Sequence, residues 1–368
     1  MKLGVPKERK IKENRVALTP EVVKQLLAKG YECILEKGAG ESAHFSDTDY
    51  LAAGATLVDS ADAIYSGSDV VLKVNPPEPA DVAKMKKGAI LLSFMYALTN
   101  PDLVNACVEA GVTAFSVDAI PRISRAQKMD ALSSQANLAG YKSVILGADH
   151  LGKIFPMLMT AAGTIKPSKV VIFGAGVAGL QAIATAKRLG AIVEVSDIRP
   201  ETKEQVQSLG GKFIEVKADE SVKMEGGYVK GVSEEFLQRQ KELVSKHVAD
   251  ADLVITTALI PGKKAPVLVT EAMVKNMKNG SVIVDMAVEQ GGNCELSEYN
   301  KTVVKNGVTI IGEPNLPAML PFNASDLYAK NISTFLLHLS DKDGFKFEME
   351  EEITKGSCII KDGVKLIA

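Results

Sequence analysis

Residues 169–199, KVVIFGAGVAGLQAIATAKRLGAIVEVSDIR, contain the pattern that decides the fold. The apolar run 170–173 has the composition of a parallel strand that is buried on both faces. Three glycines follow in GxGxxG spacing, and an apolar stripe that ends at a further glycine predicts a helix after them. A second strand is predicted at 191–196, with Asp197 directly behind it. Strand, glycine turn, helix, strand and acid in this order predict a dinucleotide-binding unit.

Each glycine of the turn has its own task. Gly174 permits the tight turn, Gly176 lets the backbone approach a pyrophosphate, and Gly179 lets the helix pack close to the sheet. A carboxylate in the place of Asp197 can accept a hydrogen bond from a ribose 2′-hydroxyl and repels the 2′-phosphate of NADP, so NAD is favoured. Arg199 could bind such a phosphate, but we expect it to lie along the adenine or in solvent.

The composition is that of a globular protein with two domains. The chain has 368 residues, of which 46% are hydrophobic and 24% are charged, enough apolar side chains for two cores. A net charge of −2 with interspersed signs argues against nucleic acid as a partner. The four cysteines are scattered without CxxC spacing, so we expect reduced thiols and neither a disulfide framework nor a metal site. These are Cys33, Cys107, Cys294 and Cys358.

The N-terminus is too charged for a signal peptide, and no apolar run approaches the 18 or more residues of a membrane-spanning helix. We therefore expect no direct membrane insertion by this chain. If the protein serves a membrane process, another chain or region must cross the bilayer.

Short apolar strands alternate with amphipathic helices along residues 1–130, which is typical of an α/β unit with a parallel sheet. Residues 133–165 are expected to link this unit to the glycine motif. The helix 324–340 has an apolar face that could return to the first domain, and the tail 344–368 contains short strand-like pieces. Strands are predicted at 2–5, 31–36, 56–58, 70–74, 89–94, 252–256 and 281–285, and helices at 20–29 and 233–248.

The sequence offers no evident catalytic base. None of the four histidines neighbours a serine or cysteine in a nucleophile setting, and structural or surface roles are expected for His44, His150, His247 and His338. Oxidation of an alcohol or amine by hydride transfer releases a proton and normally uses a base beside the substrate. Hydride transfer between two nicotinamide rings releases none and needs only two rings held face to face with water excluded. An NAD-binding chain without a base fits this second chemistry better.

Two cations stand in notable contexts. Arg15 lies in ENRVALTP, and Lys73 ends the apolar strand in VVLKVNPP. Each could bind a substrate carboxylate, and each could equally be an ion-paired structural residue. The sequence leaves both interpretations open.

Six segments together resemble one family, in order and over nearly the whole chain. The sequence is similar to the soluble NAD(H)-binding domain of the alpha subunit of proton-translocating NAD(P) transhydrogenase, in the alanine dehydrogenase/transhydrogenase family. The chain ends where the membrane part of that family would begin, which implies a split form of three polypeptides or a domain trimmed to this region. The segments are PRISRAQKMDALSSQANLAGY, VVIFGAGVAGLQAIATAKRLGA, TKEQVQSLGGKF, GGY at 226–228, TTALIPGKKAPVLVT and VDMAVEQGGNC.

The resemblance implies an architecture and partners. It implies two Rossmann-like domains, residues 1–132 with 323–368 and residues 133–322, so that the C-terminal segment completes the first. The chain would form a homodimer and bind NAD(H), while a separate subunit presents NADP(H) for direct hydride transfer. Membrane-spanning subunits would translocate the protons, and the chain would lie in the cytoplasm against the inner face of the membrane.

The resemblance also assigns site residues. Arg122 and Asp130 with Ser133 would fix the carboxamide, and Gln127 would reach toward the NADP(H) side; Arg122, Gln127 and Asp130 form the catalytic set. Tyr228 matches a mobile lid, although without the resemblance it would be an ordinary loop aromatic. The other residues assigned to the cofactor are Ile123, Ser124, Arg125, Lys128, Met129, Gly174, Gly176, Val177, Ala178, Gly179, Asp197, Ile198, Arg199, Gly227, Gln240, Ala258 and Leu259. Among these, residues 177–179 would hold the pyrophosphate at a helix N-terminus, and Asp197 would take the adenosine ribose.

Two alternatives remain. Alanine dehydrogenase, a relative, shares the fold and the contexts of Arg15 and Lys73, and its second carboxylate corresponds to Glu289. It uses a histidine after the strand that reads LLSF, whereas this chain continues with Met95 and Tyr96, which argues against amino-acid oxidation. The other alternative is a catalytically silent NAD-binding module that only docks a partner; the intact set at 122–130 argues against it.

Overall fold

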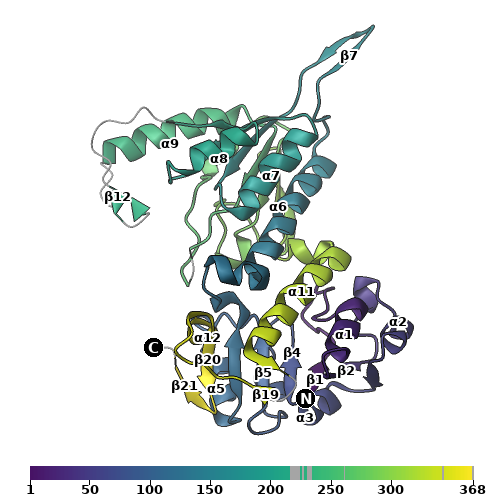
Figure 1. Cartoon of the computed structure of the whole chain (residues 1–368). Coiled ribbons are helices and arrows are strands. Elements are labelled where there is room, and N and C mark those ends of the chain that lie inside the picture. The colour runs from purple at the N-terminus through teal and green to yellow at the C-terminus, as the bar shows by residue number, and fades with distance from the viewer. Residues whose placement is uncertain (216–223, 226–227, 230–233, 261, 342–343, 367–368) are drawn as a thin grey trace. The chain divides into compact units, whose positions relative to one another are not determined.

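The computed structural model describes residues 1–215, 224–225, 228–229, 234–260, 262–341 and 344–366 (Figure 1). Contacts divide the chain into two compact units, residues 1–135 with 317–368 and residues 136–316. The first unit is therefore built from both ends of the chain, and the second from its middle. Both are α/β units with mostly parallel sheets, as the sequence predicts.

The first unit contains an eight-stranded sheet in the order β21-β20-β6-β5-β4-β1-β2-β3. Strands β1 to β6 are parallel and follow the 3-2-1-4-5-6 order of a Rossmann fold. The expectation of a purely parallel sheet is corrected at one edge, where β20 pairs antiparallel with β6 and β21 with β20. The strands are β1 (Lys2–Val5), β2 (Glu32–Glu36), β3 (Thr56–Val58), β4 (Val70–Leu72), β5 (Ile90–Ser93), β6 (Thr113–Ser116), β20 (Cys358–Lys361) and β21 (Val364–Lys365).

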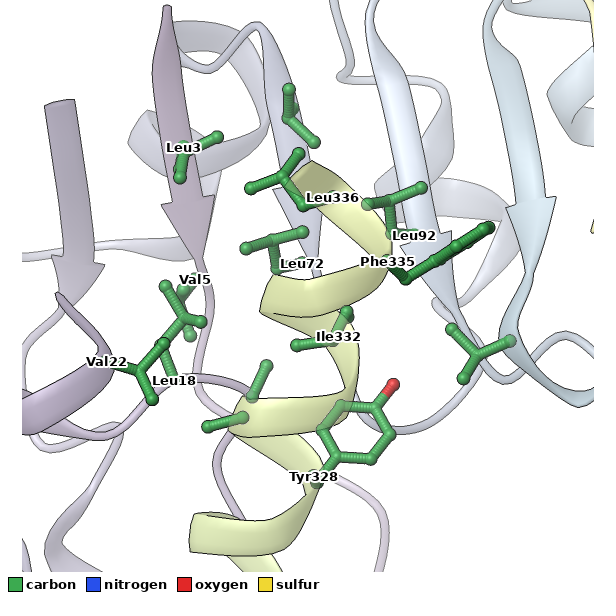
Figure 2. Packing of buried hydrophobic residues seen from close by; sticks show 14 of the residues in the cluster. Leu3, Val5, Leu18, Val22, Leu72, Leu92, Tyr328, Ile332, Phe335 and Leu336 are labelled. Carbon is green, nitrogen blue, oxygen red and sulfur yellow. The ribbon is translucent and has the colours of Figure 1, made fainter. Parts of the chain in front are cut away.

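Helix α11 (Pro321–Leu339) completes the core of this unit. Proline at its first position fixes a helical φ without losing a needed hydrogen bond. The spacing of Tyr328, Ile332, Phe335 and Leu336 gives one apolar face, and all four side chains are fully buried against the sheet (Figure 2). The Tyr328 hydroxyl donates to the carbonyl oxygen of Lys73 at 2.6 Å. The C-terminal segment therefore belongs to the core of the first unit.

The remaining elements of the first unit are short. The tail, expected to hold only strand-like pieces, also contains a helix, α12, whose first turn is capped by Glu351. The helices are α1 (Pro20–Leu27), η1 (Glu41–Ala43), α2 (Asp47–Ala52), α3 (Ala61–Gly67), α4 (Pro79–Val82), α5 (Pro101–Glu109), η2 (Val117–Ala119), η3 (Ser124–Met129) and α12 (Glu352–Ser357), and β18 (Ser340–Asp341) pairs antiparallel with β19 (Gly344–Phe345).

The second unit repeats the same strand order. Its seven-stranded sheet runs β11-β10-β9-β14-β15-β17-β16, and all neighbours are parallel except β16, which pairs antiparallel with β17. The strands are β9 (Lys169–Phe173), β10 (Ile192–Ser196), β11 (Lys212–Phe213), β14 (Leu253–Thr256), β15 (Val282–Asp285), β16 (Lys301–Lys305) and β17 (Val308–Gly312).

Residues 136–165, expected to serve as a link, belong to the second unit. Helix α6 (Ala131–His150) packs closely on α7 (Val177–Arg188), because a Cβ at Gly140 would lie 2.1 Å from the carbonyl oxygen of Ala178. A hairpin of β7 (Leu158–Thr160) and β8 (Gly163–Ile165) then projects from the rest of the unit (Figure 1). The other elements are α8 (Thr202–Ser208), β12 (Met224–Glu225), β13 (Tyr228–Val229), α9 (Glu234–Ala249), α10 (Glu271–Lys275) and η4 (Val288–Gln290), and η5 (Leu316–Met319) begins at the last residue of this unit and continues into the first.

Candidate functional site

The glycine turn lies in the second unit, between β9 and α7. Gly174 has a φ of +95°, and a Cβ there would lie 2.4 Å from the hydroxyl oxygen of Thr257. A Cβ on Gly179 would lie 1.9 Å from the carbonyl oxygen of Gly174, so this position accepts only glycine. Gly176 differs, because a Cβ on it would meet no heavy atom of the described residues within 4 Å. Packing requires the first and third glycines, whereas the second faces open space at the N-terminus of α7.

Asp197 adjoins this turn, as its place after β10 predicts. Its Oδ2 accepts from the backbone N–H of Ala175 at 2.6 Å, and its side chain is only 4% exposed. Arg199 does not extend into solvent but pairs with it, the Nη2 of Arg199 lying 3.0 Å from Oδ2 of Asp197. Burial acts to raise the pKa of Asp197, but the hydrogen bonds from Arg199 and Ala175 outweigh it and lower the pKa. Asp197 is therefore an ionised acceptor beside the turn.

A second buried carboxylate, which the sequence reasoning missed, shapes the opposite side of the turn. Asp285 ends β15 with no exposed surface and accepts hydrogen bonds from five groups. One of these is the backbone N–H of Asn293, whose fully buried side chain in turn bonds both backbone groups of Ala258 at 3.0 and 2.9 Å. The five donors to Asp285 are the hydroxyls of Thr256 and Ser297 and the backbone N–H groups of Ala287, Asn293 and Cys294.

This relay fixes the loop that follows β14, in which Ala258 and Leu259 are predicted to line the cofactor cleft. Leu259 is largely exposed, as is Ile198 after β10. An acid that ends an apolar strand, as Asp285 does in VIVD, is by itself a weak indication of a functional residue. Asp285 could still have been predicted, because ligands bind at the carboxyl ends of parallel strands and Asp285 ends such a strand.

The second predicted group of residues lies in the first unit, on η3 and the start of α6. Ala126 and Met129 are buried in the core, while Arg122, Gln127 and Lys128 are exposed. The backbone of this loop is therefore anchored by its apolar side chains, and Arg122, Gln127 and Lys128 lie at the surface, where a ligand can reach them.

Asp130 and Ser133 are brought together as the sequence implies. Oδ1 of Asp130 accepts from the backbone N–H of Ser133 at 2.9 Å, and Oδ2 accepts from the Ser133 hydroxyl at 2.6 Å. This is also the geometry of an N-cap on the first turn of α6. The pair has a structural role in addition to the predicted contact with the carboxamide.

Helices α11 and α12 hold the same loop from its other side. The amide of Asn331 donates to the carbonyl oxygen of Lys128 at 2.9 Å and accepts from the hydroxyl of Ser134 at 2.7 Å. Arg125 pairs with Glu351, with its Nη1 at 3.2 Å from Oε1. Although burial acts to raise the pKa of Glu351, hydrogen bonds from the backbone of α12 and from His338 lower it to about 2. Arg125 is thus engaged by an ionised carboxylate.

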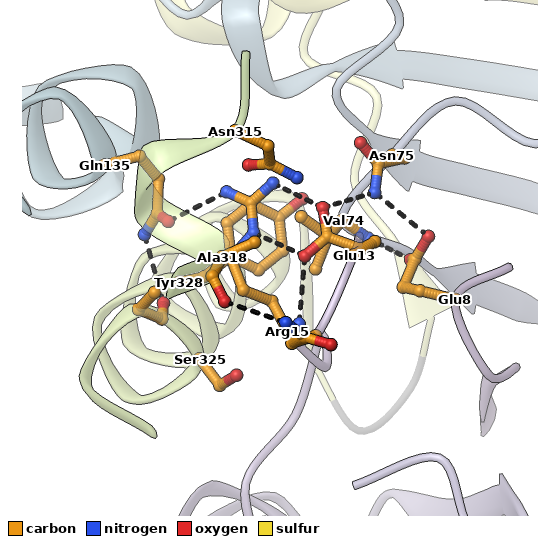
Figure 3. Close-up of polar contacts among 12 residues, drawn as sticks. Glu8, Glu13, Arg15, Val74, Asn75, Gln135, Asn315, Ala318, Ser325 and Tyr328 are labelled. Atoms are coloured by element: carbon orange, nitrogen blue, oxygen red, sulfur yellow. Dashed lines mark hydrogen bonds and ion pairs between the residues drawn. The ribbon is translucent and has the colours of Figure 1, made fainter. Parts of the chain in front are cut away.

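Arg15 and Lys73 belong to a buried polar cluster in the first unit, and Figure 3 shows Arg15 with Glu13, Asn75 and Glu8. Arg15 donates from Nε and Nη2 to Glu13 at 2.8 and 2.7 Å and from Nη1 to Gln135 at 2.9 Å. Lys73 lies 3.1 Å from Glu8, and Asn75 bridges the two glutamates at 3.3 and 2.8 Å. The structure therefore favours the ion-paired interpretation that the sequence left open.

Charge pairing governs this cluster. Burial acts to raise the pKa of Glu13, but the hydrogen bonds and charge of Arg15 lower it to about 2. Both cations have buried anionic partners, so a ligand carboxylate would have to compete with Glu8 and Glu13 for them.

The histidines and cysteines singled out in the sequence make contacts typical of structural residues. His247 bonds to the buried carboxylate of Glu194 at 2.6 Å, His150 to the carbonyl oxygen of Leu146, and His44 ends η1 in a left-handed conformation. Burial raises the pKa of all four cysteine thiols to about 11 or 12. Gly227 and the side chains of Tyr228 and Gln240 lie outside the described residues.

Within the described residues, no group of three or more histidine, cysteine or acidic side chains could hold a metal ion. Among those same residues, no helix has both the length and the apolar character needed to cross a membrane.

Two family models match consecutive stretches of the sequence. The N-terminal domain of "Alanine dehydrogenase/PNT" matches residues 4–139, and the C-terminal domain of the same family matches residues 143–367. The chain belongs to the alanine dehydrogenase/PNT family. The expected resemblance is thereby confirmed.

Within this family, the chain is similar to an NAD(P) transhydrogenase subunit alpha polypeptide of Rhodospirillum rubrum, with 52% identity over 99% of this chain and 97% of that protein. The crystal structure of transhydrogenase from Sinorhizobium meliloti is 43% identical and superposes with a TM-score of 0.91 over 100% of both chains. A structure of L-alanine dehydrogenase is 31% identical, with a TM-score of 0.84 over 100% of this chain and 97% of the other. Both branches share the fold, and the sequence is closer to the transhydrogenases.

Proposed function

We propose that this chain is the NAD(H)-binding subunit of a proton-translocating NAD(P) transhydrogenase. It binds NAD(H) and exchanges hydride directly with NADP(H) on a partner subunit, and it is active only with its partners. The observation that supports this most is the glycine turn, where Gly176 faces open space between the helix N-terminus and an ionised Asp197. Such a place can receive a pyrophosphate and its adenosine ribose.

The residues present fit that cofactor. The backbone N–H groups of residues 177–179 would hold the pyrophosphate, and Asp197 the ribose. Arg122, Asp130 and Ser133 would hold the carboxamide, and Gln127 would approach the second nucleotide. The bound dinucleotide supplies the hydride or accepts it. The protein orients the ring and excludes water, and no proton has to be moved by a side chain.

Amino-acid oxidation fits less well. Arg15 and Lys73, the cations that could bind a substrate carboxylate, are buried beside Glu13 and Glu8. Tyr96 follows β5 where a histidine would be expected, and its φ of +47° is unusual for an aromatic residue. Among the described residues, the two cations that would bind a substrate carboxylate are therefore already paired, and no histidine follows β5 as it does in alanine dehydrogenase.

A homodimer is part of the proposal. Met157, Leu158, Met159 and Ile165 are exposed on or beside the β7–β8 hairpin, and apolar side chains exposed on a projecting hairpin support burial against a second copy. A pocket of about 560 Å³ at the base of the hairpin, lined by Leu151, Phe155 and Leu189 among others, adds apolar surface there. We place the dimer in the cytoplasm, held to the inner face of a membrane through membrane-spanning subunits.

The exchange assay tests the proposal. Mixed with an NADP(H)-binding transhydrogenase domain, the purified chain should reduce an NAD analogue at the expense of NADPH, and it should not reduce NAD with L-alanine. Because the chemistry moves no proton, the exchange rate should stay nearly flat between about pH 6 and 9. Turnover with alanine alone would favour the dehydrogenase, and NADH binding without exchange would favour the silent module.

A substitution at Gln127 separates chemistry from binding. Gln127→Asn shortens an exposed side chain that is assigned to the NADP(H) side, so hydride exchange should slow about tenfold or more while NADH affinity changes less than about threefold. Stopped-flow exchange and NADH fluorescence measure the two quantities. Arg188→Gln, on the far end of α7, serves as the exposed control. Equal losses in rate and affinity would contradict the assigned role.

A further inference from the structure

The carboxylate of Asp197 has no acceptor position left for a ribose. Oδ1 accepts from the backbone N–H of Arg199 at 2.8 Å and from its Nε at 3.1 Å. Oδ2 accepts from the backbone N–H of Ala175 at 2.6 Å and from Nη2 of Arg199 at 3.0 Å. An ionised carboxylate offers about four lone-pair positions. All of them are used, two by the side chain of one residue.

Only one of these partners can leave easily. The N–H of Ala175 belongs to the glycine turn and that of Arg199 to the chain beyond β10, so both are fixed by the backbone. The guanidinium of Arg199 is different, because its side chain is 42% exposed whereas that of Asp197 is 4% exposed. A ribose hydroxyl that donates to Asp197 therefore has to replace the guanidinium.

We propose that the Arg199 side chain is a competing occupant of the ribose site and leaves Asp197 when NAD(H) binds. This inference rests on the proposed binding of NAD(H). Arg199 is then a specificity-determining residue, because it lowers the affinity for the nucleotide that bears a free 2′-hydroxyl. The guanidinium remains in solvent or against the adenine once it has been displaced.

The same side chain has the opposite effect on NADP(H). A 2′-phosphate brings an anion and no hydroxyl donor, and a guanidinium already beside Asp197 can bind it bidentately. Arg199 therefore reduces the repulsion between Asp197 and the phosphate. Without Arg199, the negative charge of Asp197 would face the 2′-phosphate with no neighbouring cation. The preference for NAD(H) over NADP(H) should therefore increase.

Direct binding to the purified chain tests this without any hydride transfer. Arg199→Ala should bind NADH about two- to fivefold more tightly, because the guanidinium of a partly exposed ion pair no longer competes with the ribose hydroxyl. The same variant should bind NADPH more weakly than the natural chain does. NADH fluorescence and titration calorimetry at low and at physiological salt measure both affinities.

Three controls isolate the mechanism. Lys203→Ala removes the same charge nearby, where Lys203 pairs with Glu215 at the surface, and should not tighten NADH binding. In an Asp197→Asn background, Arg199→Ala should no longer change the affinity for NADH, because the charged acceptor is gone. The analogue of NADH that lacks the adenosine 2′-hydroxyl should gain less from Arg199→Ala than NADH itself gains.

The outcomes are distinct. If the natural chain binds no NADH, the proposed function fails together with this inference. If it binds NADH but Arg199→Ala leaves that affinity unchanged or weakens it, only the inference fails. It also fails if Lys203→Ala tightens binding equally, because the effect would then come from net charge. Tighter NADH and weaker NADPH binding in Arg199→Ala alone supports it.

Discussion

The two units share one strand order but differ at the point where that order reverses. In a sheet of order 3-2-1-4-5-6 this point lies beyond the carboxyl ends of the first and fourth strands, and ligands bind there. In the first unit, Glu8 follows β1 and Lys73 follows β4, and the two form a buried ion pair. In the second unit, the glycine turn follows β9 and Thr257 follows β14. The switch point of the first unit is occupied by the Glu8–Lys73 ion pair. The switch point of the second unit instead presents the backbone N–H groups of the glycine turn.

This difference shows what topology decides and what residues decide. Topology places a possible site at the same edge of both sheets. Whether the site can accept a ligand depends on which polar groups already have partners within the unit. A buried charge that loses its partner costs about 3–5 kcal/mol, so the first switch point resists opening. The second needs only the displacement of one exposed guanidinium.

Gly179→Ala should have the largest effect, because it closes the open switch point. Its Cβ would lie 1.9 Å from the carbonyl oxygen of Gly174, and relief of this overlap has to shift the turn or α7. Because NADH binding would have to restore the displaced turn, strain on the order of 3 kcal/mol should appear as roughly 100-fold weaker NADH binding. NADH titration measures it, with thermal unfolding in parallel.

The matched control is Gly176→Ala. A Cβ there meets no described atom within 4 Å, and the φ of −78° suits alanine, so the thermal midpoint should not change. NADH affinity should still fall, because the methyl group occupies space that the pyrophosphate needs. Unchanged NADH affinity in Gly179→Ala would remove the glycine turn from the site.

Glu13→Gln weakens the buried cluster that adjoins the filled switch point, because Asn75 bridges Glu13 and Glu8. Arg15 is buried and would lose its charged partner, so the free energy of unfolding should fall by about 3 kcal/mol. Urea unfolding followed by circular dichroism measures it. Glu21→Gln, which removes the same charge from an exposed position on α1, should change stability by less than about 0.5 kcal/mol. A loss as small in Glu13→Gln would mean that the cluster is not held by its charges.

Acid should weaken the same cluster. Glu13 has a pKa of about 2 in the folded chain against 4.5 for the free side chain. Because the folded value is the lower one, the stabilisation is complete above pH 4.5 and is lost as the pH falls toward 2. We therefore compare the unfolding free energies of the natural chain and of Glu13→Gln, which should differ by about 3 kcal/mol near neutral pH. This difference should shrink steadily as the pH falls below 4.5, the pKa of the free glutamate side chain. A difference that stays constant down to about pH 2.5 would contradict this.

Asn293→Leu should have the smallest effect. It tests whether the open switch point of the second unit also depends on the hydrogen bonds that run from Asp285 through Asn293 to Ala258. It leaves the backbone groups of Ala258 without their partner, which costs about 1–3 kcal/mol and lets the loop after β14 move. We expect a lower thermal midpoint and several-fold weaker NADH binding. Asn276→Leu, at the exposed end of α10, is the control. Weaker binding without any loss of stability would point to direct contact between Asn293 and the nucleotide.

The sequence predicted the architecture well where the signals are local. The parallel strands and the glycine turn follow from apolar runs and spacing, and the α/β class is confirmed. The edge strand β16 and the hairpin at 158–165 were not predicted, and the strand-like pieces expected in the tail did not reveal that β20 and β21 pair antiparallel at a sheet edge. Their pairing depends on where the chain returns, and their side chains lack a clear alternation of apolar and polar residues.

For the candidate site, sequence reasoning identified residues but not their partners. It left a substrate-binding and an ion-paired role open for Arg15 and Lys73 and named no partner for either, and it expected Arg199 along the adenine or in solvent. Partners in space depend on side-chain direction, which spacing along the chain does not give. The roles assigned to Arg122, Gln127 and Asp130 remain predictions.

The position of α11 sets the order in which the chain can fold during synthesis. The core of the first unit needs Tyr328, Ile332 and Phe335, which leave the ribosome only after all of residues 136–316. At about 5–20 residues per second that delay is roughly 10–40 s. During it the second unit can already fold, while the earliest strands of the first unit expose the apolar faces that α11 later covers.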